Sequence, residues 1–286
     1  MSKQLKADIS LLVISMIWGA GMPVMSLALQ HIGPYTFMLT RYSIATIILL
    51  PFVVKRLRKA EKESIKGGAL IGLSMFLGSL LQTIALLYTT PSKAGFLTGL
   101  YSIFVPVITA VIYRKLPDLK TVFAVGISLF GLAVMTIEGA SGINIGDVLL
   151  VVSAVAYAFQ ILLVGKYAKS EYILETTFMQ MLVVSLLSFI PSMAMEKFYV
   201  PINKTTVLSV LFIAVFSTVV AYMVQNKMQP YTDPTHAAII FLSEPLFVAI
   251  FSIFVGDILT VRTLIGGVFI MLGMLVINIK TGKNEG

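Results

Sequence analysis

Ten apolar stretches, each long enough to cross a lipid bilayer, fill almost the whole chain of 286 residues. A bilayer core requires about 20 apolar residues in each spanning helix, and little of this chain remains for any other purpose. The pattern therefore excludes a soluble globular fold. The stretches lie at residues 7–29, 34–54, 67–88, 92–113, 119–137, 145–165, 174–195, 206–228, 234–255 and 259–279.

The composition agrees with a lipid environment, because 58% of the residues are hydrophobic and only 12% are charged. Lipid offers the backbone no hydrogen-bond partners, so spanning segments must be helices or closed barrels. The apolar stretches lack the period-two alternation that barrel strands show. The sequence therefore predicts an all-α integral membrane protein with ten transmembrane helices.

The basic residues are divided unevenly between the two sets of loops that this topology creates. Sixteen of the 21 lysines and arginines fall on the side that holds the N-terminus, and the densest run is residues 55–66. Because basic residues concentrate in cytoplasmic loops, we expect a multi-pass protein of the cell membrane with both termini in the cytoplasm. No nucleic-acid partner is expected, since this run lacks the interleaved aromatic residues on which bases stack.

The chain has an internal repeat, in which residues 1–140 match residues 141–286 weakly but consistently. Each copy holds five expected helices. Five is an odd number, so the second copy must enter the membrane from the opposite face. In transporters built from such inverted repeats, the substrate lies near the midplane between the two copies. The matching pairs include Trp18 with Tyr157, Gln82 with Gln225, and the Tyr-Thr-x-Pro motif at 88–91 with the same motif at 231–234.

Four segments carry a resemblance to a known family: MIWGAGMPV in the first stretch, PYTFMLTRYSIA in the second, KAGFLTGLYSIFVPV in the fourth and FLSEPLFVAIFSIFVGD in the ninth. Together they resemble the EamA-type members of the drug/metabolite transporter superfamily over nearly the whole chain. The resemblance implies a ten-helix exporter or facilitator of small metabolites, with a cavity lined mainly by helices 1, 3, 4, 6, 8 and 9. The GDILT segment departs from the family pattern, because no basic residue follows its acid, so we assign coupling elsewhere.

Glu244 is an acidic residue near the middle of the ninth stretch, ten residues after Pro234. A carboxylate there is costly unless a charged or hydrogen-bonding group pairs with it. Arg41 and Lys93 are the candidate charge partners. Glu244 is the candidate coupling residue, because it could accept a proton in competition with substrate. The alternative is a structural role, in which Glu244 is protonated or bonds to the backbone freed by Pro245.

Polar residues form stripes at helical spacing on several of the apolar stretches. Two interpretations remain open: the stripes line a water-filled cavity, or they form hydrogen bonds between helices. For Arg41, packing or snorkelling is the alternative to a substrate contact. The candidate substrate-binding residues are Trp18, Ser79, Gln82, Tyr101, Tyr157, Gln160, Tyr222, Gln225 and Glu244.

These features favour a secondary transporter that exports a small amphipathic metabolite, such as an amino acid or a related compound, by alternating access. An uncoupled facilitator with the same cavity is the alternative. An intramembrane enzyme is disfavoured, because no nucleophile stands beside a base and the two histidines are far apart in sequence. The chain has no cysteine, so we expect neither a metal site nor a cofactor. The sequence allows a homodimer and leaves the identity of the substrate open.

Overall fold

The computed structural model describes residues 3–112, 114, 119–136, 144–168, 171–232, 234–241 and 243–278. These residues form helices joined by short connections, and they contain no β-strand. The expected boundary between the two copies, at residues 140 and 141, lies outside the described residues. In the first part of the chain the elements are α1 (Lys3–Leu29), α2 (Pro34–Val53), the 3₁₀ turn η1 (Leu57–Lys59), α3 (Lys62–Ala85), α4 (Pro91–Thr98), α5 (Tyr101–Ile112) and α6 (Leu119–Thr136).

The second part of the chain begins at α7. Its elements are α7 (Ile145–Tyr167), α8 (Ile173–Met195), α9 (Lys204–Phe212), the π-helix η3 (Ile213–Val220), α10 (Ala221–Met228), the 3₁₀ turn η4 (Gln229–Tyr231), α11 (Pro234–Phe241), α12 (Ser243–Ile253) and α13 (Val261–Asn278). Helices α9, η3 and α10 follow one another without a break, and η4 follows α10 directly. A turn at residues 54–56 leads from α2 into η1.

Seven helical stretches are long and apolar enough to cross a membrane, judged on the described residues. Three shorter apolar helices cover parts of the remaining expected spans, at Val122–Gly131, Ser243–Ile253 and Val261–Gly273. The chain is therefore all-helical and contains several candidate membrane spans, as the sequence predicts.

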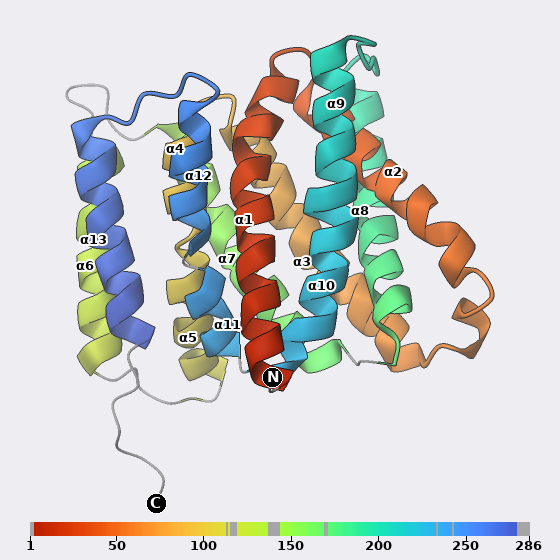
Figure 1. Cartoon of the computed structure of the whole chain (residues 1–286), viewed down its shortest axis with the longest axis horizontal. Coiled ribbons are helices and arrows are strands. Elements are labelled where there is room, and N and C mark those ends of the chain that lie inside the picture. The colour runs from red at the N-terminus through yellow and green to blue at the C-terminus, as the bar shows by residue number, and fades with distance from the viewer. Residues whose placement is uncertain are drawn as a thin grey trace, which may run out of the picture.

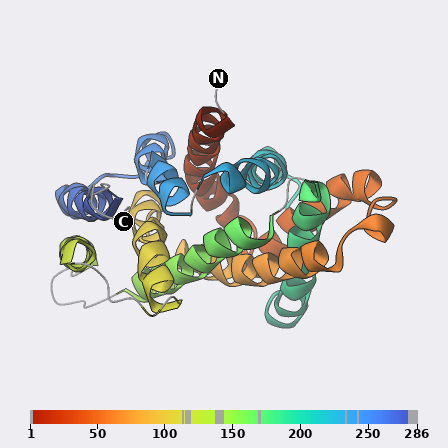
Figure 2. The ribbon, with the colours of Figure 1, turned by 90° about the horizontal axis from the view of Figure 1, so that it is seen from below.

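The helices form two layers, which are capped at each end by a helix pair (Figures 1 and 2). One layer holds α1, α10, α11 and α12, and the other holds α3, α5 and α7. Helices α6 and α13 pack together at one end, and α2 and α8 pack together at the other end. Helix α1 also packs on α12, where a Cβ atom on Gly19 would overlap the Cβ atom of Phe247. This close approach brings the two helices together beside the space between the layers.

A carboxylate from α8 caps the start of α2. Glu196 accepts hydrogen bonds from the backbone N–H groups of Tyr35 at 3.1 Å and Thr36 at 2.8 Å, and from the Thr36 hydroxyl at 2.7 Å. The first N–H groups of a helix have no partner within the helix, and a negative charge there is stabilised by the helix dipole. The C-terminal end of α8 therefore lies against the N-terminal end of α2, and the two helices are antiparallel.

Replacing Glu196 by alanine is expected to lower the free energy of unfolding by about 2 kcal/mol, because three hydrogen bonds to one carboxylate are lost at a helix start. Denaturant unfolding of the purified protein in detergent measures this change. Lys197→Ala is the matched control, since Lys197 is the exposed neighbour of Glu196. Equal effects of the two substitutions would show that the cap does not stabilise α2.

Candidate functional site

A cavity lies between the two layers of helices. Its wall combines aromatic rings, amide groups, one arginine and one carboxylate. The lining residues are Trp18, Gly21, Met22, Met25, Arg41, Gln82, Thr98, Tyr101, Tyr157, Gln160, Ile161, Ile213, Ser217, Tyr222, Gln225, Phe241 and Glu244.

The structure brings together eight of the nine candidate substrate-binding residues around this cavity. Ser79 is the exception, because it is buried behind the wall and bonds to the hydroxyl groups of Tyr42 at 2.8 Å and Tyr157 at 3.0 Å. Ser79 therefore holds Tyr157 in place and does not face the cavity. Its position in the same stripe as Gln82 gave no indication of this difference.

A turn between α4 and α5 meets α11 and α12 at the cavity. The chain turns between α4 and α5 at Gly99 and Leu100, where the Ser102 hydroxyl donates to the Gly99 carbonyl at 2.7 Å. In the other half, α11 ends at Phe241 and α12 begins at Ser243. The sequence indicates a disturbance at Pro106 in the first of these helices, but the interruption falls several residues earlier. Gly99 keeps right-handed helical backbone angles there, with φ −55° and ψ −17°.

Tyr101, at the start of α5, bonds to the end of α11 and to the start of α12. Its hydroxyl lies 2.9 Å from Oε2 of Glu244 and 3.2 Å from the backbone oxygen of Phe241. Pro245 has no N–H group for the Phe241 carbonyl four residues earlier, which leaves this oxygen free for Tyr101. The hydroxyl has one proton, so it can donate fully to only one of the two acceptors at a time.

Glu244 is only partly buried, and it is among the residues that line the cavity. Within the described residues, its only hydrogen bond is the one that Oε2 accepts from Tyr101. The second carboxylate oxygen therefore remains available to a ligand or to water.

Arg41 lies on α2, and 6% of its surface is exposed. Its Nε donates to the hydroxyl of Thr218 at 2.7 Å, and its guanidinium carbon lies 4.8 Å from the centre of the Tyr42 ring. No ion pair joins Arg41 to Glu244 within the described part of the chain. The two charges line one cavity without neutralising each other.

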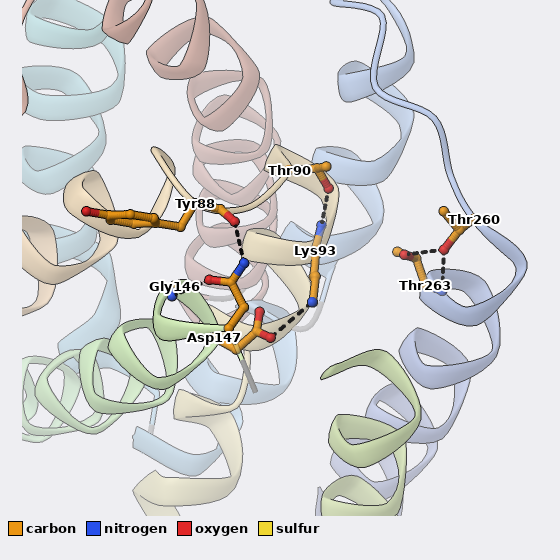
Figure 3. A network of polar contacts seen from close by, with 8 residues as sticks. Tyr88, Thr90, Lys93, Gly146, Asp147, Thr260 and Thr263 are labelled. Atoms are coloured by element: carbon orange, nitrogen blue, oxygen red, sulfur yellow. Dashed lines mark hydrogen bonds and ion pairs between the residues drawn. The ribbon is translucent and has the colours of Figure 1, made fainter. Parts of the chain in front are cut away.

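Lys93 is not a partner of Glu244, and this expectation is wrong. Its Nζ lies 3.0 Å from Oδ2 of Asp147, and both side chains are buried (Figure 3). Lys93 lies in the first turn of α4 and Asp147 in the first turn of α7, so the ion pair joins the first half of the chain to the second. Lys93 lies at the end of its helix that is remote from Glu244, and a nearer carboxylate takes its charge.

Two separate hydrogen-bond networks hold the amide groups. In the first, Gln82 accepts from the Tyr157 hydroxyl at 3.0 Å and donates to the Thr98 hydroxyl at 3.3 Å. In the second, Gln160 donates to Gln225 at 3.0 Å, and Gln225 donates to Gln229 at 2.9 Å. The amides therefore bond between helices and also line the cavity, so both interpretations of the polar stripes apply to the same residues.

Aromatic rings form one side of the cavity. The ring of Trp18 lies 5.3 Å from that of Tyr222 and 5.5 Å from that of Phe241, measured between centroids. The indole N–H of Trp18 donates to the backbone oxygen of Ser217 at 3.0 Å. Such a wall suits the apolar part of a small molecule, because the rings offer a large apolar surface and the indole N–H already has a partner.

The π-helix η3 explains why the Ser217 oxygen is free to accept this bond. The N–H of Ala221 bonds to the carbonyls of Phe216 and Thr218 and bypasses Ser217. Within the same wide turn, the Thr218 hydroxyl donates to the Ile213 oxygen five residues back at 2.8 Å. Short π segments often mark functional sites. Here one segment positions both Trp18 and Arg41.

The sequence analysis missed several lining residues, which are Gly21, Met22, Met25, Thr98, Ile161, Ile213, Ser217 and Phe241. Most are small or apolar, and in an apolar helix nothing separates them from residues that face lipid. Phe241 is the exception, since Pro245 four residues later indicates a free carbonyl at that position.

The sequence profile of the EamA-like transporter family matches residues 5–137 of this chain and matches again at residues 144–279. The chain belongs to the EamA-like transporter family. It is accordingly a member of the drug/metabolite transporter superfamily and a membrane protein with several spans. The family places it among transporters that lie in a lipid bilayer and bind small molecules, not among enzymes.

Several relatives of this EamA protein are named as transporters whose substrates are not stated. A protein of Archaeoglobus fulgidus named "Uncharacterized transporter" is 33% identical, and the match covers 97% of this chain and 87% of the relative. The "Uncharacterized transporter YyaM" of Bacillus subtilis is 22% identical, with 96% and 93% covered. A solved crystal structure of a protein at 14% identity covers both chains completely with a TM-score of 0.70, which supports the fold alone.

Proposed function

We propose that this EamA protein is a secondary transporter of the cell membrane that exports a small amphipathic metabolite by alternating access. The observation that carries the proposal is the cavity, in which Arg41, Glu244 and several amides lie beside an aromatic wall. Ionisable residues inside membrane segments commonly mark a substrate or ion pathway. Every residue that lines the cavity comes from this one chain.

The proposed architecture has ten membrane-crossing helices in two inverted repeats of five. The double match of the family profile, at residues 5–137 and 144–279, supports two copies. Helix packing supports a two-fold relation between them, because α3 contacts α7 and the equivalent pair, α1 with α9, η3 and α10, is also in contact. Under the repeat, Tyr101 and Glu244 are equivalent positions 143 residues apart, and they bond to each other.

An inverted repeat supplies the two states that transport needs. If the halves exchange their conformations, a cavity open to one side of the membrane becomes open to the other. Helices α4 and α5 in one half and α11 and α12 in the other are equivalent under the repeat, and Tyr101 joins the start of α5 to the end of α11. We infer that they move against each other during this exchange. The excess of basic residues on the N-terminal side supports cytoplasmic termini.

Proton coupling is assigned to Glu244. An ionised Glu244 accepts the hydrogen bond from Tyr101. A protonated Glu244 would be a weaker acceptor, which would favour donation from the Tyr101 hydroxyl to the Phe241 oxygen 3.2 Å away. Protonation would thus change the contacts that α5 makes with α11 and α12, and a substrate cation would compete with the proton for the same carboxylate.

An uncoupled facilitator is the second candidate. It is favoured by the bond between Glu244 and Tyr101. In a facilitator, this carboxyl group has the structural role of joining α12 to α5 and carries no proton. The two candidates differ in accumulation, since a facilitator equilibrates its substrate but never concentrates it.

Counterflow in proteoliposomes tests the carrier, after a thermal-shift screen against a metabolite library has identified a ligand that stabilises the folded protein. Vesicles loaded with unlabelled ligand should accumulate the labelled ligand transiently. The same vesicles with an imposed pH gradient separate the coupled carrier from the facilitator. Absence of counterflow for every stabilising ligand would contradict the carrier.

Filling the cavity should block transport. Met25 lines it from α1, and we expect Met25→Trp to lower the initial rate of counterflow roughly ten-fold, equivalent to about 1.4 kcal/mol of lost binding. Leu12→Trp on the same helix is the control, since 44% of Leu12 is exposed on the outer surface of the protein. Equal rates for the two variants would place the transport path outside this cavity.

A further inference from the structure

The cavity contains a buried guanidinium group, that of Arg41, and most of its N–H donors have no acceptor among the described residues. A guanidinium group has five N–H donors. Within the described residues, only the Nε of Arg41 makes a hydrogen bond, and its acceptor is Thr218. Arg41 is 6% exposed and lines the cavity, so a molecule in the cavity can accept hydrogen bonds from its remaining N–H groups.

No acidic side chain of the described residues neutralises Arg41. The ion pairs found there join Lys93 to Asp147 and Arg56 to Glu175. Glu244 lines the same cavity, but it bonds to Tyr101 instead. Buried charges are normally paired, and an intramembrane arginine without a partner marks a functional site by default.

The orientation of Arg41 is fixed before any ligand arrives. Thr218 holds Nε, and the Tyr42 ring stacks beside the guanidinium group at 4.8 Å. Thr218 is itself held by its bond to the Ile213 oxygen in the π-helix. A planar guanidinium that is held in this way matches a carboxylate with two parallel hydrogen bonds.

We propose that Arg41 binds the carboxylate of the transported molecule, while Glu244 binds a cationic group at the other end of that molecule. The substrate is then a small zwitterion, and its apolar part lies against the rings of Trp18, Tyr222 and Phe241. A zwitterion neutralises both charges of the cavity at once, which neither a neutral molecule nor a simple amine can do. This assignment rests on the proposed transport function and names the substrate class of the same cavity.

The test compares matched ligands on the purified wild-type protein. The probes are the standard amino acids, the corresponding amines that lack the carboxylate, and the corresponding carboxylates that lack the amino group. Thermal shifts identify the binders, and isothermal titration gives their dissociation constants. We expect at least one amino acid to bind about ten-fold or more tightly than either of its truncated analogues.

Arg41→Gln should weaken binding of that amino acid about 30-fold and leave binding of the matching amine unchanged. Arg41→Lys should give an intermediate loss, because lysine keeps the charge without the planar fork. Arg56→Gln is the control, since Arg56 follows the end of the same helix outside the cavity. Should Arg41→Gln fail to fold, the Arg41→Lys comparison still decides the matter.

The outcomes separate this inference from the transport function. If the protein shows counterflow only with neutral or purely cationic ligands, the carboxylate site is wrong and the carrier stands. If Arg41→Lys weakens the amino acid and the amine equally, Arg41 is a structural residue and the inference is overturned. If the wild type shows no counterflow with any stabilising ligand, the proposed function fails, and the assignment of a transported zwitterion fails with it.

Discussion

Replacing Lys93 by alanine is expected to destabilise the protein by about 3–5 kcal/mol, because it leaves the carboxylate of Asp147 buried without its cation. The two side chains are 10% and 2% exposed, and Nζ lies 3.0 Å from Oδ2. Asp147 lies in the first turn of α7 and Lys93 in the first turn of α4, so the loss also weakens a contact between the two halves. Denaturant unfolding in detergent, followed by tryptophan fluorescence, measures the change.

A double substitution provides the control for this prediction. Lys93→Met together with Asp147→Asn removes both charges, and it should recover a large part of the lost stability, since an apolar replacement of a buried pair is often tolerated. A double variant as unstable as the sum of the single variants would show that the pair is not coupled. A change below about 1 kcal/mol for Lys93→Ala would show that the pair acts as a surface ion pair.

The second large effect is expected from Glu244→Gln, which keeps the shape of the side chain but can no longer bind and release a proton. The wild type, exchanging one proton per substrate, should concentrate substrate roughly ten-fold for a pH difference of one unit without a membrane potential. The variant should reach only equal concentrations, although counterflow persists at saturating ligand. Uptake into proteoliposomes with an imposed pH gradient measures both quantities.

Tyr101→Phe separates coupling from the structural role of Glu244. It removes the hydroxyl that bonds to Glu244 and to the Phe241 oxygen while retaining the ring. We expect weaker coupling, with less accumulation for the same pH gradient, because Glu244 can still bind a proton but no longer changes the contacts that α5 makes with α11 and α12. Accumulation by Glu244→Gln that equals the wild-type value would remove Glu244 from the coupling role.

The positions of the helices could be predicted from the sequence because lipid constrains them strongly. Apolar stretches of about 20 residues have few alternatives to a helix, and α1, α2 and α8 lie within a few residues of their expected ranges. The cavity residues could be found for a related reason. Polar side chains such as Gln82, Tyr157 and Gln225 are costly in lipid, so each marks a face that turns inward.

The interruptions of the helices were harder to predict, since they depend on contacts that form only after folding. The π-helix at Ile213–Val220 has no proline or glycine to mark it. Its carbonyl at Ser217 is satisfied by Trp18, which is 199 positions away in the chain. The prediction that Lys93 pairs with Glu244 was wrong for a similar reason, because distance along the sequence does not indicate which carboxylate is nearest in space.

The central claim is that two halves of opposite orientation enclose the cavity, and side-specific labelling tests it most directly. The chain has no cysteine, so single cysteines can be placed without a background. Lys59→Cys follows the second helix of the first half, and Lys197→Cys follows the second helix of the second half; both positions are exposed. In sealed vesicles of one orientation, an impermeant thiol reagent should label one of these variants and leave the other untouched until the membrane is permeabilised. Labelling of both cysteines from the same side would contradict the account.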